Sequence, residues 1–294
     1  MSDLKIATVL NHTCLLGEGP VWDAAQNRIL WIDILRAEFH SFNVVENKHQ
    51  IADTGCMIGS FALRNTGGII AAMQDGINEA DGNFKSFRRV IDPENDLPDN
   101  RFNEGKCDPS GRFWAGTMSL TDQPERGSLY MVDREFEITR KIANISISNG
   151  LAWNAAAGKM YFIDTPTYQV VQYDFNNLNG EITNRKTIIS VAKEQGSPDG
   201  MTIDTEGMLW IAHWDGWQIT RWNPETGELL MHIKMPAGRI TSCTFGGNNF
   251  TDLYITSAKT GLTEQQLSEQ PLAGSLFVIR NCGYQGFPPV LFAG

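Results

Sequence analysis

The sequence is poor in cysteine, and its cysteines are far apart. Only five occur among 294 residues, and they form neither a Cys-x-x-Cys pair nor a compact ligand cluster. This spacing disfavours a disulfide framework and a cysteine-based zinc site. We therefore expect free thiols, packed as small apolar groups in a reducing compartment. The five residues are Cys14, Cys56, Cys107, Cys243 and Cys282.

Long apolar runs and excess positive charge are also absent. No uninterrupted apolar run approaches the roughly 18 residues needed to cross a membrane. The first residues lack a basic region followed by an apolar stretch, so a secretory signal is not expected and the cytoplasm is predicted. The net charge of -10 disfavours nucleic acid and anionic membranes as partners. Cations and neutral small molecules remain compatible with it.

Several common functional motifs are missing. No Gly-x-Ser-x-Gly sequence indicates a serine esterase, and no complete phosphate-binding loop is present. The acidic stretch 92–100 has Leu97 where a calcium-binding EF-hand loop needs glycine. We expect this stretch to be a proline-bent loop that leads Arg101 and Asn103 to a functional site.

What the sequence does contain is a repeated strand-turn-strand unit. The clearest copy has one short strand over 197–204, a turn containing Gly207 and a second, apolar strand over 208–212. Six copies can be aligned, with intervals of 40, 46, 45, 50 and 42 residues between equivalent anchor positions. A period of this length, built from short strands, predicts an all-β fold: a six-bladed β-propeller. The anchors are Gly19, Gly59, Gly105, Gly150, Gly200 and Ser242.

The two ends of the chain should meet in the last blade. Only 52 residues follow the sixth anchor, and the apolar run 6–10 precedes the first copy. We expect that run to add a strand to the sixth blade, closing the ring and pairing two otherwise exposed sheet edges. No linker interrupts the repeat, so residues 1–294 are predicted to form a single domain.

The residue before each anchor points to a metal site. Equivalent positions on the innermost strands of a propeller converge on one axis, and four of the six can offer a carboxylate or amide oxygen. Crowded carboxylates need a cation, and hard divalent ions such as calcium accept carboxylate and amide oxygens together. The alternative is that Asn and Asp before Gly are ordinary turn residues. The six residues are Glu18, Ile58, Glu104, Asn149, Asp199 and Thr241.

Five stretches together resemble the regucalcin/gluconolactonase (senescence marker protein) family of sugar-lactone hydrolases. They are ordered and spaced as in that family, and the resemblance covers essentially the whole chain. The stretches are 16–22 (LGEGPVW), 101–106 (RFNEGK), 108–118 (DPSGRFWAGTM), 148–153 (SNGLAW) and 198–201 (PDGM).

The resemblance implies a propeller with one catalytic divalent metal at the mouth of its channel. Carried over by matching motif, Glu18, Asn149 and Asp199 would be the metal ligands, with calcium, zinc, manganese or magnesium as the ion. Arg101 and Asn103, with the adjacent Glu104, would face the substrate. The residues after the Gly-Thr-Met motif, 119–122, depart from the acidic pattern of some family members, which puts the sugar preference in doubt.

These features predict a metal-dependent hydrolase that opens aldonolactones to aldonic acids. The ion would polarise the lactone carbonyl, and Asp199 would take a proton from the attacking water, with Glu18 as the other candidate base. Two alternatives remain open: a promiscuous esterase or organophosphate hydrolase of the same fold, and a non-catalytic calcium-binding or interaction propeller. The expected partner is a small sugar lactone, and the chain is expected to be a monomer or weak homo-oligomer.

Overall fold

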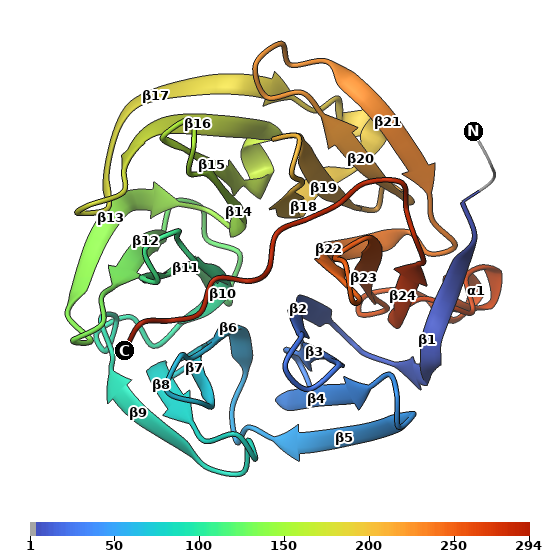
Figure 1. Cartoon of the computed structure of the whole chain (residues 1–294), viewed down its shortest axis with the longest axis horizontal. Coiled ribbons are helices and arrows are strands. Elements are labelled where there is room, and N and C mark those ends of the chain that lie inside the picture. Colours follow the sequence, from blue (N-terminus) through green and yellow to red (C-terminus); the bar gives the residue numbers. More distant parts are fainter. Residues whose placement is uncertain (1–3) are drawn as a thin grey trace.

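Six four-stranded antiparallel sheets form a ring around a central channel (Figure 1). The computed structural model describes residues 4–294. The six-bladed β-propeller predicted from the repeat is therefore confirmed. Within the described residues, no helix is long and apolar enough to cross a membrane.

Each blade runs from an inner strand at the channel to an outer strand at the rim. The first blade contains β2 (Gly17–Asp23), β3 (Arg28–Asp33), β4 (Glu38–Asn43) and β5 (Lys48–Asp53). The second contains β6 (Ile58–Leu63), β7 (Ile69–Met73), β8 (Gly76–Ala80) and β9 (Phe87–Ile91). The third contains β10 (Asn100–Cys107), β11 (Phe113–Ser119), β12 (Gly127–Val132) and β13 (Ile138–Ile145).

The other three blades follow the same plan. The fourth contains β14 (Ser148–Asn154), β15 (Lys159–Asp164), β16 (Gln169–Asn176) and β17 (Glu181–Ser190). The fifth contains β18 (Ser197–Ile203), β19 (Leu209–Trp214), β20 (Gln218–Trp222) and β21 (Leu229–Lys234). The sixth contains β22 (Arg239–Gly246), β23 (Asp252–Ala258), β24 (Ser275–Ile279) and β1 (Ile6–Thr13). The helical elements are short: η1 (Thr165–Thr167), η2 (Lys193–Gln195) and α1 (Glu264–Glu269).

The N-terminal strand closes the ring, as predicted. β1 pairs antiparallel with β24, with Ile6 opposite Ile279. The core lies between neighbouring blades, where apolar side chains of facing sheets interdigitate. Leu30 and Phe39 of the first blade, for example, belong to one buried cluster with Phe61 of the second. Burying such side chains supplies the main favourable free energy of folding. All five cysteines are free, as expected.

The anchors of the repeat coincide with irregularities in the inner strands. In each blade the register between the inner strand and its neighbour shifts at or beside the anchor, which is the signature of a β-bulge. A bulge changes the direction in which the side chains of the strand point. The shifts fall between Glu18 and Val21, Ile58 and Ser60, Phe102 and Gly105, Asn149 and Leu151, Pro198 and Met201, and Ile240 and Ser242.

Four of the five anchor glycines, all except Gly19, also allow neighbouring inner strands to approach closely. A Cβ atom added at Gly59 would lie 2.3 Å from the carbonyl oxygen of Phe102 and 2.8 Å from the backbone nitrogen of Asn103. One added at Gly200 would lie 2.3 Å from Ser242 Oγ. The regular spacing of these glycines in the sequence therefore reflects contacts between neighbouring blades at the channel.

Gly59→Ala is expected to destabilise the protein by about 1–3 kcal/mol, because the new methyl group meets backbone that cannot rotate away. Gly82→Ala is the matched control, since a Cβ atom there would meet nothing within 4 Å. Urea unfolding of both variants gives the comparison. Equal midpoints for the two would show that close packing does not explain the repeated glycine.

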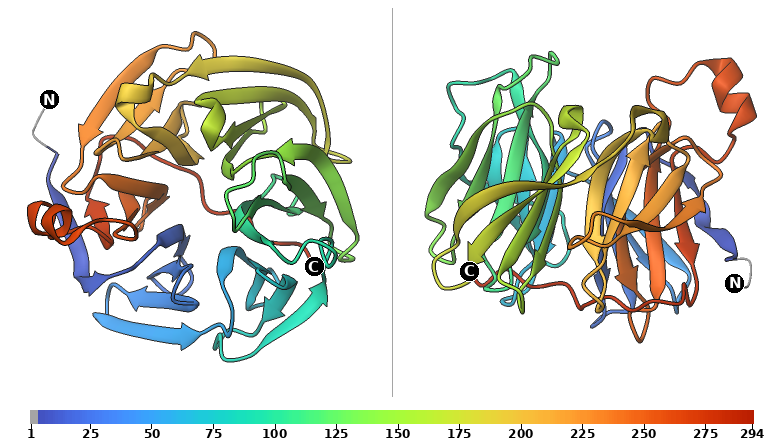
Figure 2. Two further views of the ribbon diagram at one scale, coloured as in Figure 1. Left: turned by 180° about the vertical axis from the view of Figure 1, so that it is seen from behind. Right: turned by 90° about the horizontal axis from the view of Figure 1, so that it is seen from above.

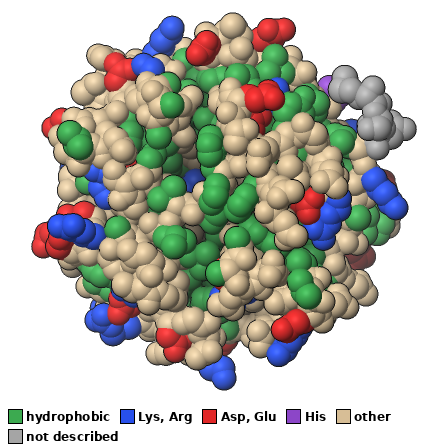
Figure 3. Space-filling model, viewed as in Figure 1, with side chains coloured by type: hydrophobic (Ala, Val, Ile, Leu, Met, Phe, Trp, Pro, Cys, Tyr) green, Lys and Arg blue, Asp and Glu red, His purple; other side chains and the backbone are tan. Residues whose placement is uncertain are grey.

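The C-terminal segment crosses one end of the channel (Figure 1). Gly286 forms an antiparallel bridge with Asp204, just after β18, and Phe292 forms a parallel bridge with Arg64, just after β6. In the side view the segment lies at the end opposite α1 (Figure 2). On the face that it crosses, apolar side chains gather over the centre (Figure 3). Phe287 of the C-terminal segment is an exposed aromatic residue.

Candidate functional site

The residues predicted from the sequence lie on the inner strands of four blades. All but Glu104 sit in the first half of their strand, away from the end that the C-terminal segment covers. All are buried, with exposed fractions between 4% and 8%. They are Glu18 on β2, Arg101, Asn103 and Glu104 on β10, Asn149 on β14 and Asp199 on β18.

Hydrogen bonds bring three of these residues together directly. Asn103 Nδ2 donates to Asn149 Oδ1 at 3.2 Å and to the carbonyl oxygen of Ser148 at 2.8 Å. Arg101 Nη1 donates to Asn103 Oδ1 at 2.7 Å. Residues from the third and fourth blades therefore share one polar network at the channel wall.

Thr165 is a member of this network that the sequence did not reveal. Asn149 Nδ2 donates to Thr165 Oγ1 at 2.8 Å, and that hydroxyl donates to the carbonyl oxygen of Pro198 at 2.8 Å. The first bond fixes the amide of Asn149, so its Oδ1 faces Asn103. The second ties the network to the residue before Asp199. Thr165 lies after β15, outside the repeated strand-turn-strand unit, so the repeat carried no signal for it.

Three buried carboxyl groups of the candidate site have raised pKa values. Burial raises the pKa of Glu18 to about 8, and the charge of Glu104 adds to the effect. Burial also raises the pKa of Asp199 well above its usual range, with further contributions from Glu18 and Glu104. Burial raises the pKa of Glu104 as well. Carboxyl groups from the first, third and fifth blades thus act on one another electrostatically.

Two cations lie among these acids. Burial lowers the pKa of Arg101 to about 10, opposed by the charges of Glu18 and Asp199. Lys106 Nζ donates to the carbonyl oxygens of Leu151 at 3.0 Å and Met201 at 2.7 Å. With every group ionised, three carboxylates would face two cations.

The donor set fits a hard divalent cation. Carboxylate and amide oxygens dominate it, and Glu104 Oε2 is buried without a hydrogen-bond partner. Such oxygens are the ligands that calcium, magnesium and manganese prefer. That Glu18, Asn149 and Asp199 together hold one ion stays a prediction.

A cavity of about 740 Å3 lies between the candidate site and the C-terminal segment. Its lining comes from the later parts of the inner strands and from the C-terminal segment, and it includes Lys106, Trp153 and Phe287. Glu104 is the one predicted site residue in this lining. The cavity is therefore not the predicted metal site, but it lies next to it along the channel.

Comparison with known proteins identifies the family. Residues 16–259 match the family model described as the SMP-30/gluconolactonase/LRE-like region. The chain is 38% identical to regucalcin of Sus scrofa and 36% identical to regucalcin of Homo sapiens, with all of each chain covered. This chain belongs to the SMP-30/gluconolactonase/LRE-like family.

Several solved structures have the same fold as this chain. A luciferin-regenerating enzyme superposes with a TM-score of 0.93 at 28% identity, covering 99% of this chain and 100% of that one. A regucalcin from Agrobacterium tumefaciens, described as a calcium-binding protein, also gives 0.93, at 26% identity and with 99% and 98% covered. A gluconolactonase from Xanthomonas campestris gives 0.77 at 19% identity, covering 94% and 89%, which shows likeness of fold only.

Proposed function

We propose that this SMP-30/gluconolactonase/LRE-like protein opens sugar lactones to aldonic acids with one divalent metal ion. The observation that supports the proposal is that Glu18, Glu104 and Asp199, on the inner strands of three blades, are buried acids with raised pKa values. Desolvated acids in contact with a substrate channel are typical of catalytic sites. The family supports a lactonase type of activity.

In this proposal, Glu18, Asn149 and Asp199 would hold the ion. Asn149 is suited to this role because Thr165 occupies its amide nitrogen and leaves the oxygen facing the site. When bound, a divalent cation supplies positive charge that polarises an ester carbonyl and stabilises the negative charge developing on its oxygen.

The side chains of the protein supply proton transfer and orientation. Asp199 would take the proton of the attacking water, and Glu18 is the other candidate base. Breaking the ring ester bond leaves an alkoxide that stays attached to the product, so the protonated acid can return its proton to it. Arg101 and Asn103, held rigidly by their mutual hydrogen bond, would position the ring hydroxyls.

Metal removal tests the proposal. We expect the chelated protein to lose nearly all hydrolysis of gluconolactone, arabinolactone, xylonolactone and galactonolactone, and to recover it when calcium, zinc, manganese or magnesium is added back. Rates are followed by acid release, with the uncatalysed opening of each lactone subtracted. Unchanged rates in metal-free protein would overturn the metal-dependent mechanism. A phosphotriester in the same series would reveal a promiscuous hydrolase.

A second candidate function is calcium binding without catalysis, which is suggested by the description of the Agrobacterium tumefaciens relative as a calcium-binding protein. Calorimetric titration of calcium separates the two functions. A protein that binds calcium at the channel but hydrolyses none of the lactones with any of the four ions would support the second. Turnover that depends on the bound ion would support the first.

A further inference from the structure

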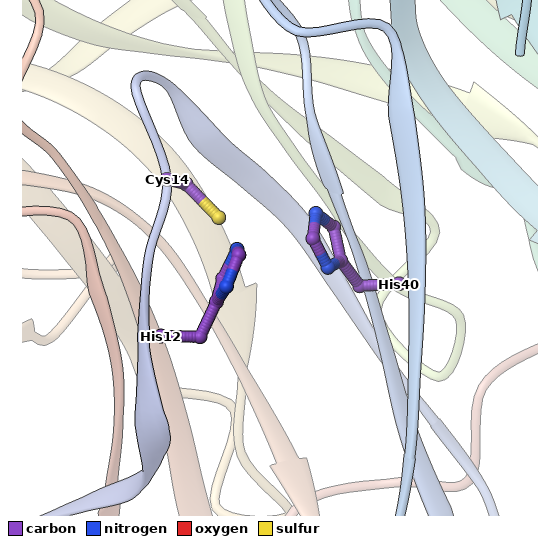
Figure 4. Close-up of side chains that lie close together, drawn as sticks. All are labelled: His12, Cys14 and His40. Carbon is purple, nitrogen blue, oxygen red and sulfur yellow. The ribbon is translucent and has the colours of Figure 1, made fainter. Parts of the chain in front are cut away.

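Three of the five histidines of the chain meet at the seam where the ring closes. His12 lies on β1, the closing strand of the sixth blade, whereas His40 and His49 lie on β4 and β5 of the first. Cys14 follows β1 directly. Figure 4 shows His12 and Cys14 on one segment facing His40 on another. One ligand atom from each of these three residues lies within 4.8 Å of the other two, and no other such trio of His, Cys, Asp or Glu exists within residues 4–294.

Two imidazole nitrogens in this cluster are buried and have no hydrogen-bond partner: His12 Nε2 and His40 Nε2. His40 uses its other nitrogen, since Nδ1 lies 3.1 Å from His49 Nε2. Glu38 Oε2 is 3.3 Å from His40 Nε2, but the two atoms form no hydrogen bond. Buried nitrogens without partners cost free energy, which a ligand would recover.

The surroundings hold these donors in place. Trp31 stacks on His40 and on His49, with ring centroids 4.8 Å and 5.3 Å apart. Its indole Nε1 donates to Cys14 Sγ at 3.4 Å. The thiol and the imidazole of His40 are thus positioned by one rigid aromatic side chain.

We propose that His12, Cys14 and His40 form a second metal site, which takes a borderline-soft divalent transition-metal ion such as zinc. Two imidazoles and one thiolate are the donors that zinc prefers over calcium or magnesium, and three protein ligands leave a fourth position for water. His40 Nε2 is the nitrogen left free for a metal, because Nδ1 is engaged by His49. The Cys14 thiol would release its proton on binding.

An ion bound there joins the closing strand to the first blade. β1 is held to β24 by backbone pairing. The ion would add a link from His12 and Cys14, at the end of β1, to His40 on β4, on the other side of the seam. Because the unfolded chain does not bring these side chains together, binding stabilises the closed ring. The cysteine spacing did not indicate this site, because the site uses one cysteine and two histidines. These side chains come together only when the ring closes.

Cobalt(II) is the probe for this site. Titration of the reduced, metal-free, full-length protein should give a near-ultraviolet sulfur-to-cobalt charge-transfer band that saturates and is abolished by zinc. A cobalt ion in the channel has oxygen ligands and gives no such band. Asp199→Asn, which changes the channel site, should therefore keep the full band, so the two metal sites are tested separately.

Matched variants assign the ligands. Cys14→Ala and His12→Gln should lose the band, whereas Cys56→Ser and the exposed His232→Gln should retain it. Zinc should raise the thermal unfolding midpoint of Asp199→Asn, whose channel site is weakened, and adding His12→Gln to that variant should remove the rise. His12 is only partly buried, so its replacement is compatible with folding. Absence of the band in the wild type, or its persistence in Cys14→Ala, would overturn the proposal.

Discussion

Asp199→Asn is expected to lower the rate of lactone hydrolysis about 10²- to 10⁴-fold, the range for loss of a positioned general base. The amide cannot accept the proton of the attacking water. It also lacks the negative charge that an ionised Asp199 would offer to a divalent ion, which weakens binding of that ion. Steady-state kcat and KM, measured at several metal concentrations, separate the two losses.

The substitution is nearly isosteric, so the variant should remain folded. Asp96→Asn, at an exposed position in the loop before β10, removes the same charge and should leave the rate unchanged. More than about a tenth of the activity remaining in Asp199→Asn, a rise of less than ~1.4 kcal/mol in the barrier, would exclude the assigned role. Full recovery at high metal concentration would make Asp199 a ligand and leave Glu18 as the base.

The fold could be predicted from the sequence because its repeat has a local physical cause. Gly59 and Gly200 recur at the propeller period because neighbouring inner strands approach too closely there for a side chain. Even the weak sixth copy, with Ser242 at the anchor, has its register shift beside that position. Wherever the same packing constraint recurs, the same residue type marks it in the sequence.

The candidate site was only partly predictable. Asn149 and Asp199 occupy repeated positions, so the repeat placed both on inner strands at the channel. Thr165, which orients Asn149, lies outside the repeated unit. His12 and His40 belong to different blades and meet only through ring closure. A sequence period reports contacts made once in every blade, and it carries no information on contacts made once in the molecule.

A further contact shows the same limit in the turns between strands. Asp108 and Asp204 each lie at the start of a glycine-containing turn. In the structure each carboxylate also accepts a hydrogen bond from the indole of the tryptophan six residues later: Trp114 and Trp210, both at 2.9 Å. The sequence predicted the turn, but not the buried polar centre that the turn residue builds.

Asp204→Ala is expected to destabilise the protein by about 3–5 kcal/mol, the cost of leaving one partner of a buried ion pair alone. Asp204 is fully buried, and its Oδ2 accepts from Arg221 Nε at 2.7 Å as well as from Trp210. Glu206 pairs with the same arginine at 2.6 Å, but its side chain is 64% exposed. Glu206→Gln should therefore cost less than about 1 kcal/mol.

Urea unfolding of the two variants compares the loss of a buried and of an exposed carboxylate that pair with the same arginine. The difference follows from solvation. In Glu206→Gln, water can replace the lost carboxylate beside Arg221. In Asp204→Ala, water cannot reach the position of the missing carboxylate. The backbone amides of Glu206 and Met208, which donate to Asp204 Oδ1 at 3.0 Å and 2.9 Å, also lose their acceptor. Equal unfolding midpoints would mean that the turn is held by its backbone geometry, and that the buried carboxylate adds little to the fifth blade.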